Sequence, residues 1–392
     1  MRAFSSPPPQ GLKIIVLLIL GSTCTSSLVP SMGYFIVEGL QQPAWKIGFY
    51  TGLVALMTML ANRRLGKLLD ASVAPRKLLI MSICSFIVFA GLLASGPRFE
   101  VLVLVGAPLM ALANGSGTTT FTFGRLYADT QDLDVGRFNA LLRMGVSLAW
   151  MIGPALTFSL VSQVGFQKTY LVSALLGVLW LVSWHFAVPS NFRAEKRTRL
   201  SAQDGNGLPL ALWFAIAACA LFAIANILFT SVLPLYFIKQ VGLPGFTPGL
   251  TLSLKCLMEI FAIFAAARLA ERFGGQAVLI SAAALALVVF VLMAHITTVW
   301  QAAAISLMEG LYYGLFAGIG ITYIQSFIPE KPGRATAIYM NCLFLGGMLG
   351  STSMGVIASA TDYRAVVMTA AGAAGLSLVL LLFTRKGQRR PA

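Results

Sequence analysis

The stretch GRFNALLRMGVSLAWMIGP, from Gly136 to Pro154, joins a charged loop to an apolar run that carries Arg143 and ends in a Gly-Pro break. Its pattern returns without a gap at residues 333–351. The identical pairs are Gly136 and Gly333, Arg137 and Arg334, Ala140 and Ala337, Leu148 and Leu345, Met151 and Met348, and Gly153 and Gly350. A repeat of nearly half the chain length indicates two similar halves, and in a membrane protein such halves are typical of transporters.

The composition places this chain in a lipid bilayer. Of its 392 residues 58% are hydrophobic and only 10% are charged, which leaves too little polar surface to cover a soluble globule. Apolar runs of about 20 residues, enough for a helix to cross a ~30 Å hydrocarbon core, recur along the whole length. Strands of a membrane barrel would be shorter and alternating. We therefore expect an all-α polytopic protein with twelve spans, near residues 12–37, 46–65, 77–95, 101–124, 138–161, 169–188, 210–238, 248–267, 276–295, 299–327, 335–359 and 364–384.

A polar stretch divides the spans into six and six. This predicts an N-terminal bundle at 1–188, a linker at 189–209 and a C-terminal bundle at 210–392. Most of the 28 Lys and Arg residues fall on the side of the termini, and those opposite are Lys46, Arg98, Lys168, Lys239 and Arg364. By the positive-inside rule both termini and the linker are cytoplasmic. The net charge of +15 is then a feature of topology, and we expect no nucleic-acid partner.

Two loops carry a second copy of the repeat. GKLLD, ending at Asp70 and followed by Arg76, closes the second span, and ARLAER, containing Glu271, closes the eighth. Both resemble the loop signature of the major facilitator superfamily, G-x-L-A-D-R-x-G-R-R, which implies two six-helix bundles related by pseudo-two-fold symmetry. The acids can pair with Arg137 or Arg334, or lie at a helix N-terminus, and so gate the protein. The alternative is that they are ordinary solvated loop charges.

Three runs resemble the bacterial sugar efflux transporters of that superfamily: ALANGSGTTTFTFGRLYADT, LLRMGVSLAWMIGPAL and AGIGITYIQSFIP. The matching residues are Asn114, Arg125, Tyr127, Ala128, Asp129, Arg143, Ser147, Leu148, Ala149, Trp150, Ile152, Gly153, Pro154, Asn226, Glu259 and Asn341. The resemblance implies a central cavity and export of sugars coupled to proton entry. With the loop residues, it gives a predicted gating set of Asp70, Arg76, Arg125, Asp129, Arg137, Gly153, Pro154, Glu271 and Arg334.

Four ionisable residues fall inside spans: Arg143, Lys255, Glu259 and Glu309. A charge at mid-membrane costs about 2.5 to 3.5 kcal/mol or more, so each should face protein or water and find a partner. Lys255 and Glu259 share a helix face and can form an ion pair. The pair is either structural, or Glu259 takes up a proton and releases Lys255. Glu309 has no basic neighbour on its own helix; it is a candidate for proton coupling or for accepting a sugar hydroxyl, or else a permanently neutral acid.

The superfamily arrangement directs spans 1, 4, 7 and 10 to the cavity, has 2, 5, 8 and 11 flank it, and turns 3, 6, 9 and 12 toward lipid. Amides and aromatic rings near the cavity can bind a sugar through its hydroxyls and its apolar face. Each amide can equally be a hydrogen bond between helices. The predicted substrate-binding set is Asn114, Arg143, Trp150, Asn226, Glu259, Glu309, Tyr312 and Asn341.

The sequence lacks the motifs of ATP-driven pumps and of membrane hydrolases. It has no metal-ligand cluster, phosphate-cradling loop or nucleophile elbow, so we expect no enzyme, no metal and no cofactor, and a proton gradient as the energy source. The leading hypothesis is a monomeric exporter of sugar-like solutes in a bacterial cytoplasmic membrane. The alternatives are a proton-coupled exporter of drugs or secreted metabolites, and a non-transporting sensor or scaffold on the same fold.

Overall fold

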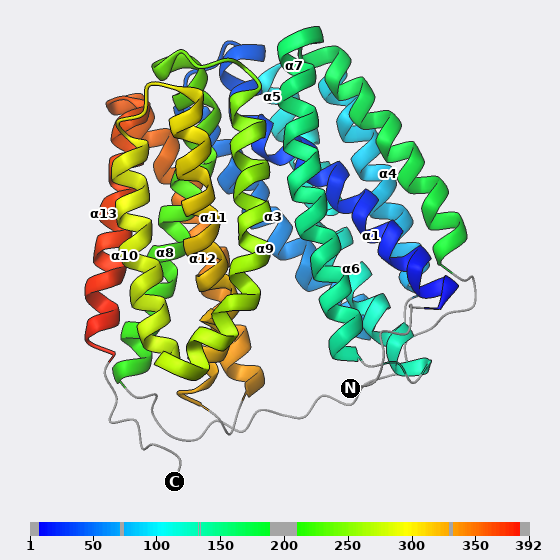
Figure 1. The fold of residues 1–392 in the computed structure, drawn as a ribbon. Coiled ribbons are helices and arrows are strands. Elements are labelled where there is room, and N and C mark those ends of the chain that lie inside the picture. The colour runs from blue at the N-terminus through cyan, green and yellow to red at the C-terminus, as the bar shows by residue number, and fades with distance from the viewer. Residues whose placement is uncertain are drawn as a thin grey trace. The chain divides into compact units, whose positions relative to one another are not determined.

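The computed structural model describes residues 8–70, 74–131, 133, 135–188, 210–328 and 332–384, and all regular structure in these ranges is helical (Figure 1). The predicted linker at 189–209 lies outside them. The first-half helices are α1 (Pro9–Leu28), α2 (Met32–Tyr34), α3 (Trp45–Asp70), α4 (Pro75–Ala94), α5 (Phe99–Val101), α6 (Ala107–Thr130) and α7 (Val135–Ala187). The second-half helices are α8 (Leu210–Leu235), α9 (Thr247–Phe273), α10 (Gly275–Met293), α11 (Val299–Gln325), α12 (Pro332–Ala360) and α13 (Tyr363–Leu382). Short 3₁₀ and π-helical turns extend several of them: η1 (Val29–Ser31), η2 (Phe35–Gly39), η3 (Leu102–Gly106) and η4 (Tyr236–Val241).

Ten helical stretches among the described residues are long and apolar enough to cross a membrane, which agrees with the predicted all-α membrane fold. One of them, Leu141–Ala187, has 47 residues and covers the two spans expected at 138–161 and 169–188. Gly165 interrupts it with φ 81° and ψ 174°, a conformation that favours glycine, and the helix reverses direction there (Figure 1). The 26-residue α3 is not among the ten, so the number twelve stays a prediction.

Side-chain caps and left-handed glycines set several helix ends in the second half. Thr298 accepts a hydrogen bond from the backbone N–H of Gln301, whose side chain bonds back to the Thr298 backbone, so α11 begins with a capping box. Asp362 caps α13 by accepting from the backbone N–H of Ala365 at 2.7 Å. Gly274, with φ 85°, separates α9 from α10.

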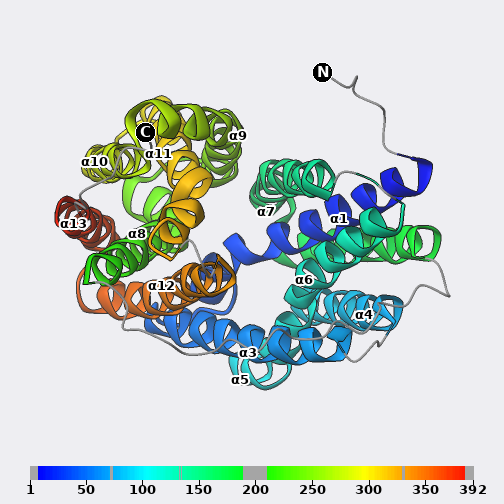
Figure 2. The same ribbon diagram turned by 90° about the horizontal axis from the view of Figure 1, so that it is seen from below.

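Contacts between residues divide the chain into two compact units. The first unit comprises Met1–Gln42 and Leu53–Leu200, and the second comprises Pro43–Gly52 and Ser201–Ala392. In the first unit α1 packs against α7, and α4 packs against α6 and α7. In the second unit α9 packs against α11, α8 against α12 and α13, and α10 against α11 and α13; Figure 2 shows these neighbours from below.

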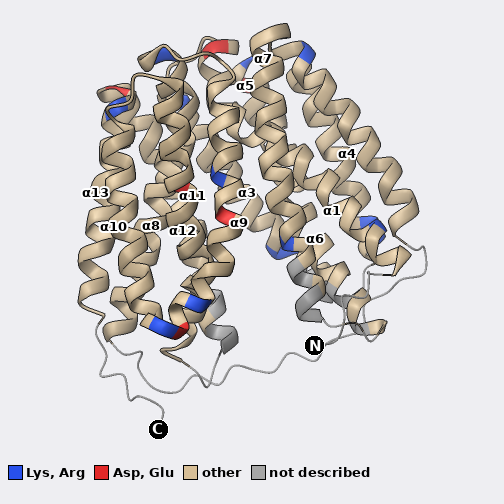
Figure 3. Ribbon diagram, in the orientation of Figure 1, with Lys and Arg blue, Asp and Glu red and all other residues tan. Residues whose placement is uncertain are grey.

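The charged residues of each unit lie mostly near the helix ends (Figure 3). A few acidic and basic positions lie far from the ends of the second unit's helices. Lys255 of α9 and Glu309 of α11 are buried, at 5% and 0% exposure. Because burying an isolated charge is costly, these two residues mark a candidate functional site.

Candidate functional site

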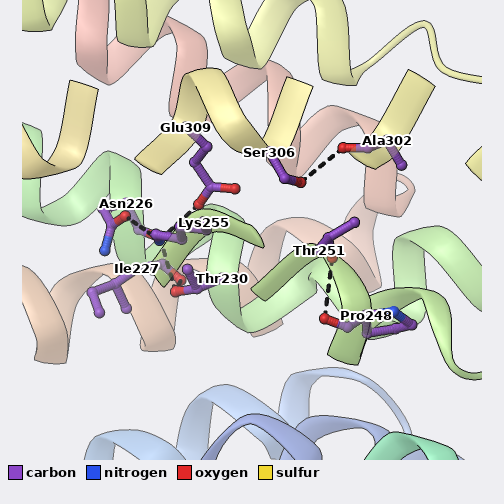
Figure 4. A network of polar contacts seen from close by, with 9 residues as sticks. All are labelled: Asn226, Ile227, Thr230, Pro248, Thr251, Lys255, Ala302, Ser306 and Glu309. Atoms are coloured by element: carbon purple, nitrogen blue, oxygen red, sulfur yellow. Dashed lines mark hydrogen bonds and ion pairs between the residues drawn. The ribbon is translucent and has the colours of Figure 1, made fainter. Parts of the chain in front are cut away.

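Three helices of the second unit bring an ionic cluster together. The Nζ atom of Lys255 on α9 lies 2.7 Å from Oε1 of Glu309 on α11, and it donates a hydrogen bond to Oδ1 of Asn226 on α8 at 3.0 Å (Figure 4). The second carboxylate oxygen of Glu309, Oε2, is buried with no hydrogen-bond partner among the described residues. The cluster therefore holds a paired charge and one unsatisfied acceptor.

Glycines on α11 explain how the ion pair forms. Gly310, Gly314 and Gly318 face α9 at four-residue intervals. A Cβ on Gly310 would clash with the backbone carbonyl of Lys255, and one on Gly314 would lie 2.5 Å from Cβ of Ala262. Small residues at this spacing let two membrane helices approach closely. Residue 309 is thereby held beside residue 255.

Two consecutive tyrosines on α11 have different environments. The Tyr313 ring lies beneath the Lys255 ammonium, with Nζ 4.9 Å from the ring centroid, which is a cation–π geometry. Tyr312 is fully buried, and its ring packs edge-on against Phe222 and Phe290, with centroids 5.6 Å apart in both cases. Tyr312, a predicted substrate-binding residue, thus lies in an aromatic core.

The predicted partner of Lys255 was wrong. Spacing along one helix indicated Glu259, whereas the structure pairs Lys255 with Glu309 of the neighbouring helix. Glu259 is half-buried and stays within electrostatic range of both residues. Glu309 has no basic neighbour on its own helix, as the sequence indicated, and its partner Lys255 comes from α9. The proton-coupling roles given to the three residues stay predictions.

The first unit contains a cavity of about 180 Å³ between α1, α6 and α7. Two predicted substrate-binding residues, Asn114 and Trp150, line it. Among the described residues that line it, none carries a charge. The complete lining is Leu17, Leu18, Gly21, Ser22, Thr25, Asn114, Ser116, Gly117, Thr120, Phe121, Val146, Trp150 and Trp180. Hydroxyls, an amide and aromatic rings suit a neutral polar solute.

The other predicted substrate-binding residues belong to neither group. Arg143 on α7 and Asn341 on α12 are exposed, and neither is among the residues that line the cavity. The structure therefore brings Asn114 together with Trp150, and Asn226 together with Glu309. The sequence analysis missed three lining residues, Trp180, Ser22 and Thr120. The segments around Ser22 and Thr120 are rich in Ser and Thr, and this composition could have indicated a polar lining.

At its Gly-Pro break, α7 lies in close contact with α1. A Cβ on Gly153 would clash with the Ser26 hydroxyl and lie 2.9 Å from the backbone nitrogen of Ser27. The same Ser26 hydroxyl donates to the backbone carbonyl of Ala149 at 2.9 Å. Pro154 lies inside α7 and is buried. Close packing against α1 within the first unit therefore explains why residue 153 is a glycine. The gating role of Gly153 and Pro154 stays a prediction.

Among the predicted gating charges, Arg76 has the best-defined contacts. Its guanidinium carbon lies 4.3 Å from the ring centroid of Trp184, and its NH1 group donates to the backbone carbonyl of Val188. The indole of Trp184 donates back to the Arg76 carbonyl at 3.1 Å. Arg76 thus holds the C-terminal end of α7 within the first unit. Glu271 is exposed on α9. The side chains of the remaining five lie outside those that the structure describes: Asp70, Arg125, Asp129, Arg137 and Arg334.

Known proteins resemble the chain over most of its length. It is 27% identical over 365 residues to "Sugar efflux transporter C" of Escherichia coli (strain K12), covering 91% of each chain. It is 28% identical over 360 residues to "Sugar efflux transporter A" of the same organism, again covering 91% of each. Among solved structures, a mutant of the nucleoside transporter NupG matches with a TM-score of 0.81 at 14% identity, covering 96% of this chain and 100% of that one. The family profile of the Major Facilitator Superfamily matches residues 14–351 and 249–392, and the chain belongs to that superfamily.

Proposed function

We propose that this chain is a secondary transporter that exports sugars or related small polar solutes in exchange for protons. The uncharged cavity of the first unit carries the solute part of the proposal, because it combines the Asn114 amide, several hydroxyls and the Trp150 ring. Its volume of about 180 Å³ is well above the ~30 Å³ that one water occupies in the liquid. The relatives named as sugar efflux transporters support the same solute class.

The ionic cluster of the second unit supports proton coupling. Lys255 and Glu309 neutralise each other at 2.7 Å in a buried site. A proton on Glu309 would leave Lys255 buried with the Asn226 amide and the Tyr313 ring only, and an unpaired buried charge is unfavourable by several kcal/mol. Glu259, one turn away on α9, is then the next carboxylate within reach. Proton binding would thus favour a different arrangement of α9 and α11.

We further propose that the protein lies in a bacterial inner membrane with both termini in the cytoplasm. The chain is a multi-pass membrane protein, and the excess of basic residues on one side supports cytoplasmic termini in a bacterial inner membrane. It would act as a monomer and move its solute without chemical change, using the proton gradient in place of a cofactor.

Transport in inside-out vesicles tests the proposal. Vesicles with an acidic interior should accumulate radiolabelled lactose or a glucoside, and an uncoupler should abolish the accumulation. Glu309→Gln and Glu259→Gln should each abolish gradient-driven accumulation, whereas Glu100→Gln, an exposed acid on α5, should behave as the wild type. Undiminished accumulation in the presence of uncoupler, and in both cluster variants, would reject proton coupling.

The drug or metabolite exporter has less support. An exporter of ionised drugs or metabolites could use Lys255 and Glu309 to hold its substrate, but the two side chains already pair with each other. Competition experiments separate the two functions: hydrophobic cations and anions should leave lactose accumulation unchanged, whereas unlabelled sugars should reduce it. Strong inhibition by a drug without inhibition by any sugar would favour the alternative. A wild type that moves none of these solutes would leave the sensor or scaffold as the remaining function.

A further inference from the structure

Asn226 lies in the ionic cluster of the second unit, although the sequence analysis predicted that it binds substrate. The residue is 7% exposed on α8, and its Oδ1 accepts a hydrogen bond from Nζ of Lys255 at 3.0 Å (Figure 4). It is not among the residues that line the cavity of the first unit. The structure therefore gives this amide a contact with a buried charge, and that contact needs a function.

Aromatic rings one turn before Asn226 hold α8 beside α11. The ring of Phe222 stacks on that of Phe316 with centroids 4.2 Å apart, and it packs edge-on against Tyr312 with centroids 5.6 Å apart. On α12, Gly350 allows a close approach, because a Cβ there would lie 3.0 Å from a backbone oxygen of α8. Asn226 thus reaches the cluster from a helix that packs closely against two others.

The Lys255 ammonium has three printed contacts of two kinds. Glu309 Oε1, at 2.7 Å, belongs to a carboxylate and can cancel the charge of the ammonium. The amide oxygen of Asn226 and the face of the Tyr313 ring, whose centroid lies 4.9 Å from Nζ, are neutral. Such neutral groups stabilise a cation through their dipole or quadrupole without cancelling its charge.

Proton binding changes how much the Asn226 contact contributes. When a proton from the acidic side forms an O–H bond on Glu309, the ammonium loses its paired carboxylate. The Asn226 oxygen and the Tyr313 ring then remain in contact with it, and Glu259 acts from one turn away through its electrostatic field. A hydrogen bond to a charged group is strongest where no counterion shares that charge. The amide therefore favours the protonated state of the cluster over the ionised state.

The ionisable groups around this contact come mainly from two helices. Among the described residues they are Lys255, Cys256 and Glu259 on α9, and Glu309, Tyr312 and Tyr313 on α11. Of the other helices that pack against α8, α13 has its ionisable residues in its first turn, and α12 contributes Tyr339, against Phe316, and Cys342, within electrostatic range of Cys219. Tyr and Cys ordinarily titrate only at alkaline pH, so a change of charge beside Lys255 comes from the two carboxylates.

We propose that Asn226 is a positioning residue for proton exchange: its amide holds the Lys255 ammonium while Glu309 carries the proton, and so sets the pH at which the cluster binds that proton. The inference rests on the proposed function and adds α8 to the proton-coupling residues. An apolar side chain at 226 would make proton binding harder, because the unpaired ammonium loses its acceptor. A carboxylate at 226 would make proton binding easier, because it pairs with Lys255 in place of Glu309.

Downhill efflux of radiolabelled lactose from proteoliposomes, with the same pH on both sides, tests the inference. The pH at which the rate falls to half on the alkaline side reports proton binding. Asn226→Leu should lower this pH by about one unit, the equivalent of one hydrogen bond to a charged group, and Asn226→Asp should raise it. The lactose concentration for half-maximal efflux should not change in either variant. Asn62→Leu on α3 is the matched control, because that half-buried amide accepts from the neutral hydroxyl of Thr118 at 3.3 Å, and it should leave the pH unchanged.

Opposite shifts in the two variants distinguish positioning from a merely structural role, which would impair both variants in the same way. If the half-maximal pH stays at the wild-type value in both, or moves in the same direction in both, the inference is wrong while proton coupling stands. Thermal unfolding shows whether each variant is folded. If Asn226→Asp does not fold, the shift in Asn226→Leu decides alone, and Asn226→Ala, with the same expected shift, replaces a Leu variant that does not fold. A wild-type rate that does not vary with pH would refute proton coupling itself, and the inference with it.

Discussion

Replacing Glu309 with leucine should destabilise the second unit strongly. The substitution leaves the Lys255 ammonium, which is 5% exposed, without the carboxylate that lies 2.7 Å away. The Asn226 amide and the Tyr313 ring remain but carry no countercharge, and Glu259, one turn away on α9, acts on Lys255 only through its electrostatic field. Removing one partner of a buried ion pair costs about 3–5 kcal/mol. For a unit of this size, that corresponds to a fall in Tm of roughly 10 °C.

The assay is thermal unfolding of purified protein in detergent, followed by fluorescence and circular dichroism. Lys255→Met combined with Glu309→Leu should recover most of the lost stability, because a buried apolar pair of similar size replaces the charges. Glu100→Gln controls for loss of an exposed acid and should leave the Tm unchanged. A fall of less than about 2 °C in Glu309→Leu, or a double variant no more stable than the single one, would show that the pair is not what balances the buried lysine.

Three further predictions concern backbone and packing. Gly314→Val should lower the free energy of unfolding by about 1–3 kcal/mol, because the Cβ of Ala262 lies only 2.5 Å from the position of the new Cβ. Gly372→Ala on α13 has open space around it and should leave the free energy of unfolding nearly unchanged in the same denaturation experiment. Gly165→Ala should cost about 1–3 kcal/mol through its φ of 81° alone, and Gly91→Ala, also without neighbouring atoms, supplies the comparison at an ordinary φ. Arg76→Gln should cost about 2 kcal/mol by removing the contacts to Trp184 and Val188; an unchanged Tm would refute the anchoring role given to Arg76.

The sequence predicted the class of fold because apolar runs of membrane-spanning length need no tertiary information. The same reasoning placed Lys255 and Glu309 inside the protein, since lipid cannot hold a charge cheaply. It chose the wrong partner for Lys255 because spacing along one helix compares only residues of that helix. The four-residue spacing of Gly310, Gly314 and Gly318 was visible in the sequence, but it does not say which helix packs against it.

The cavity shows the same limit. Asn114 and Trp150 were selected as polar and aromatic residues on spans expected near a cavity, and they do line one. Trp180 was missed because its span was assigned to lipid as a whole. Its position requires a glycine on another helix, Gly21, whose missing side chain leaves room for the indole. A contact of this kind joins positions far apart in the chain, and neither segment signals it alone.

The lining of the first unit's cavity and the ionic cluster of the second unit have no residue in common. This constrains how proton and solute movement are coupled. The lining of the first unit's cavity includes none of Asn226, Lys255 and Glu309, and no described residue of that lining is charged. A neutral solute bound there cannot compete directly with the ion pair for a proton. Under the proposed exchange, coupling must therefore pass through the arrangement of helices that each site favours. It follows that a substitution in the cavity lining should change the solute concentration that gives half-maximal transport, and transport should still require protons. A substitution of Lys255 or Glu309 in the ionic cluster should instead remove the dependence of transport on protons and leave the affinity for the solute unchanged.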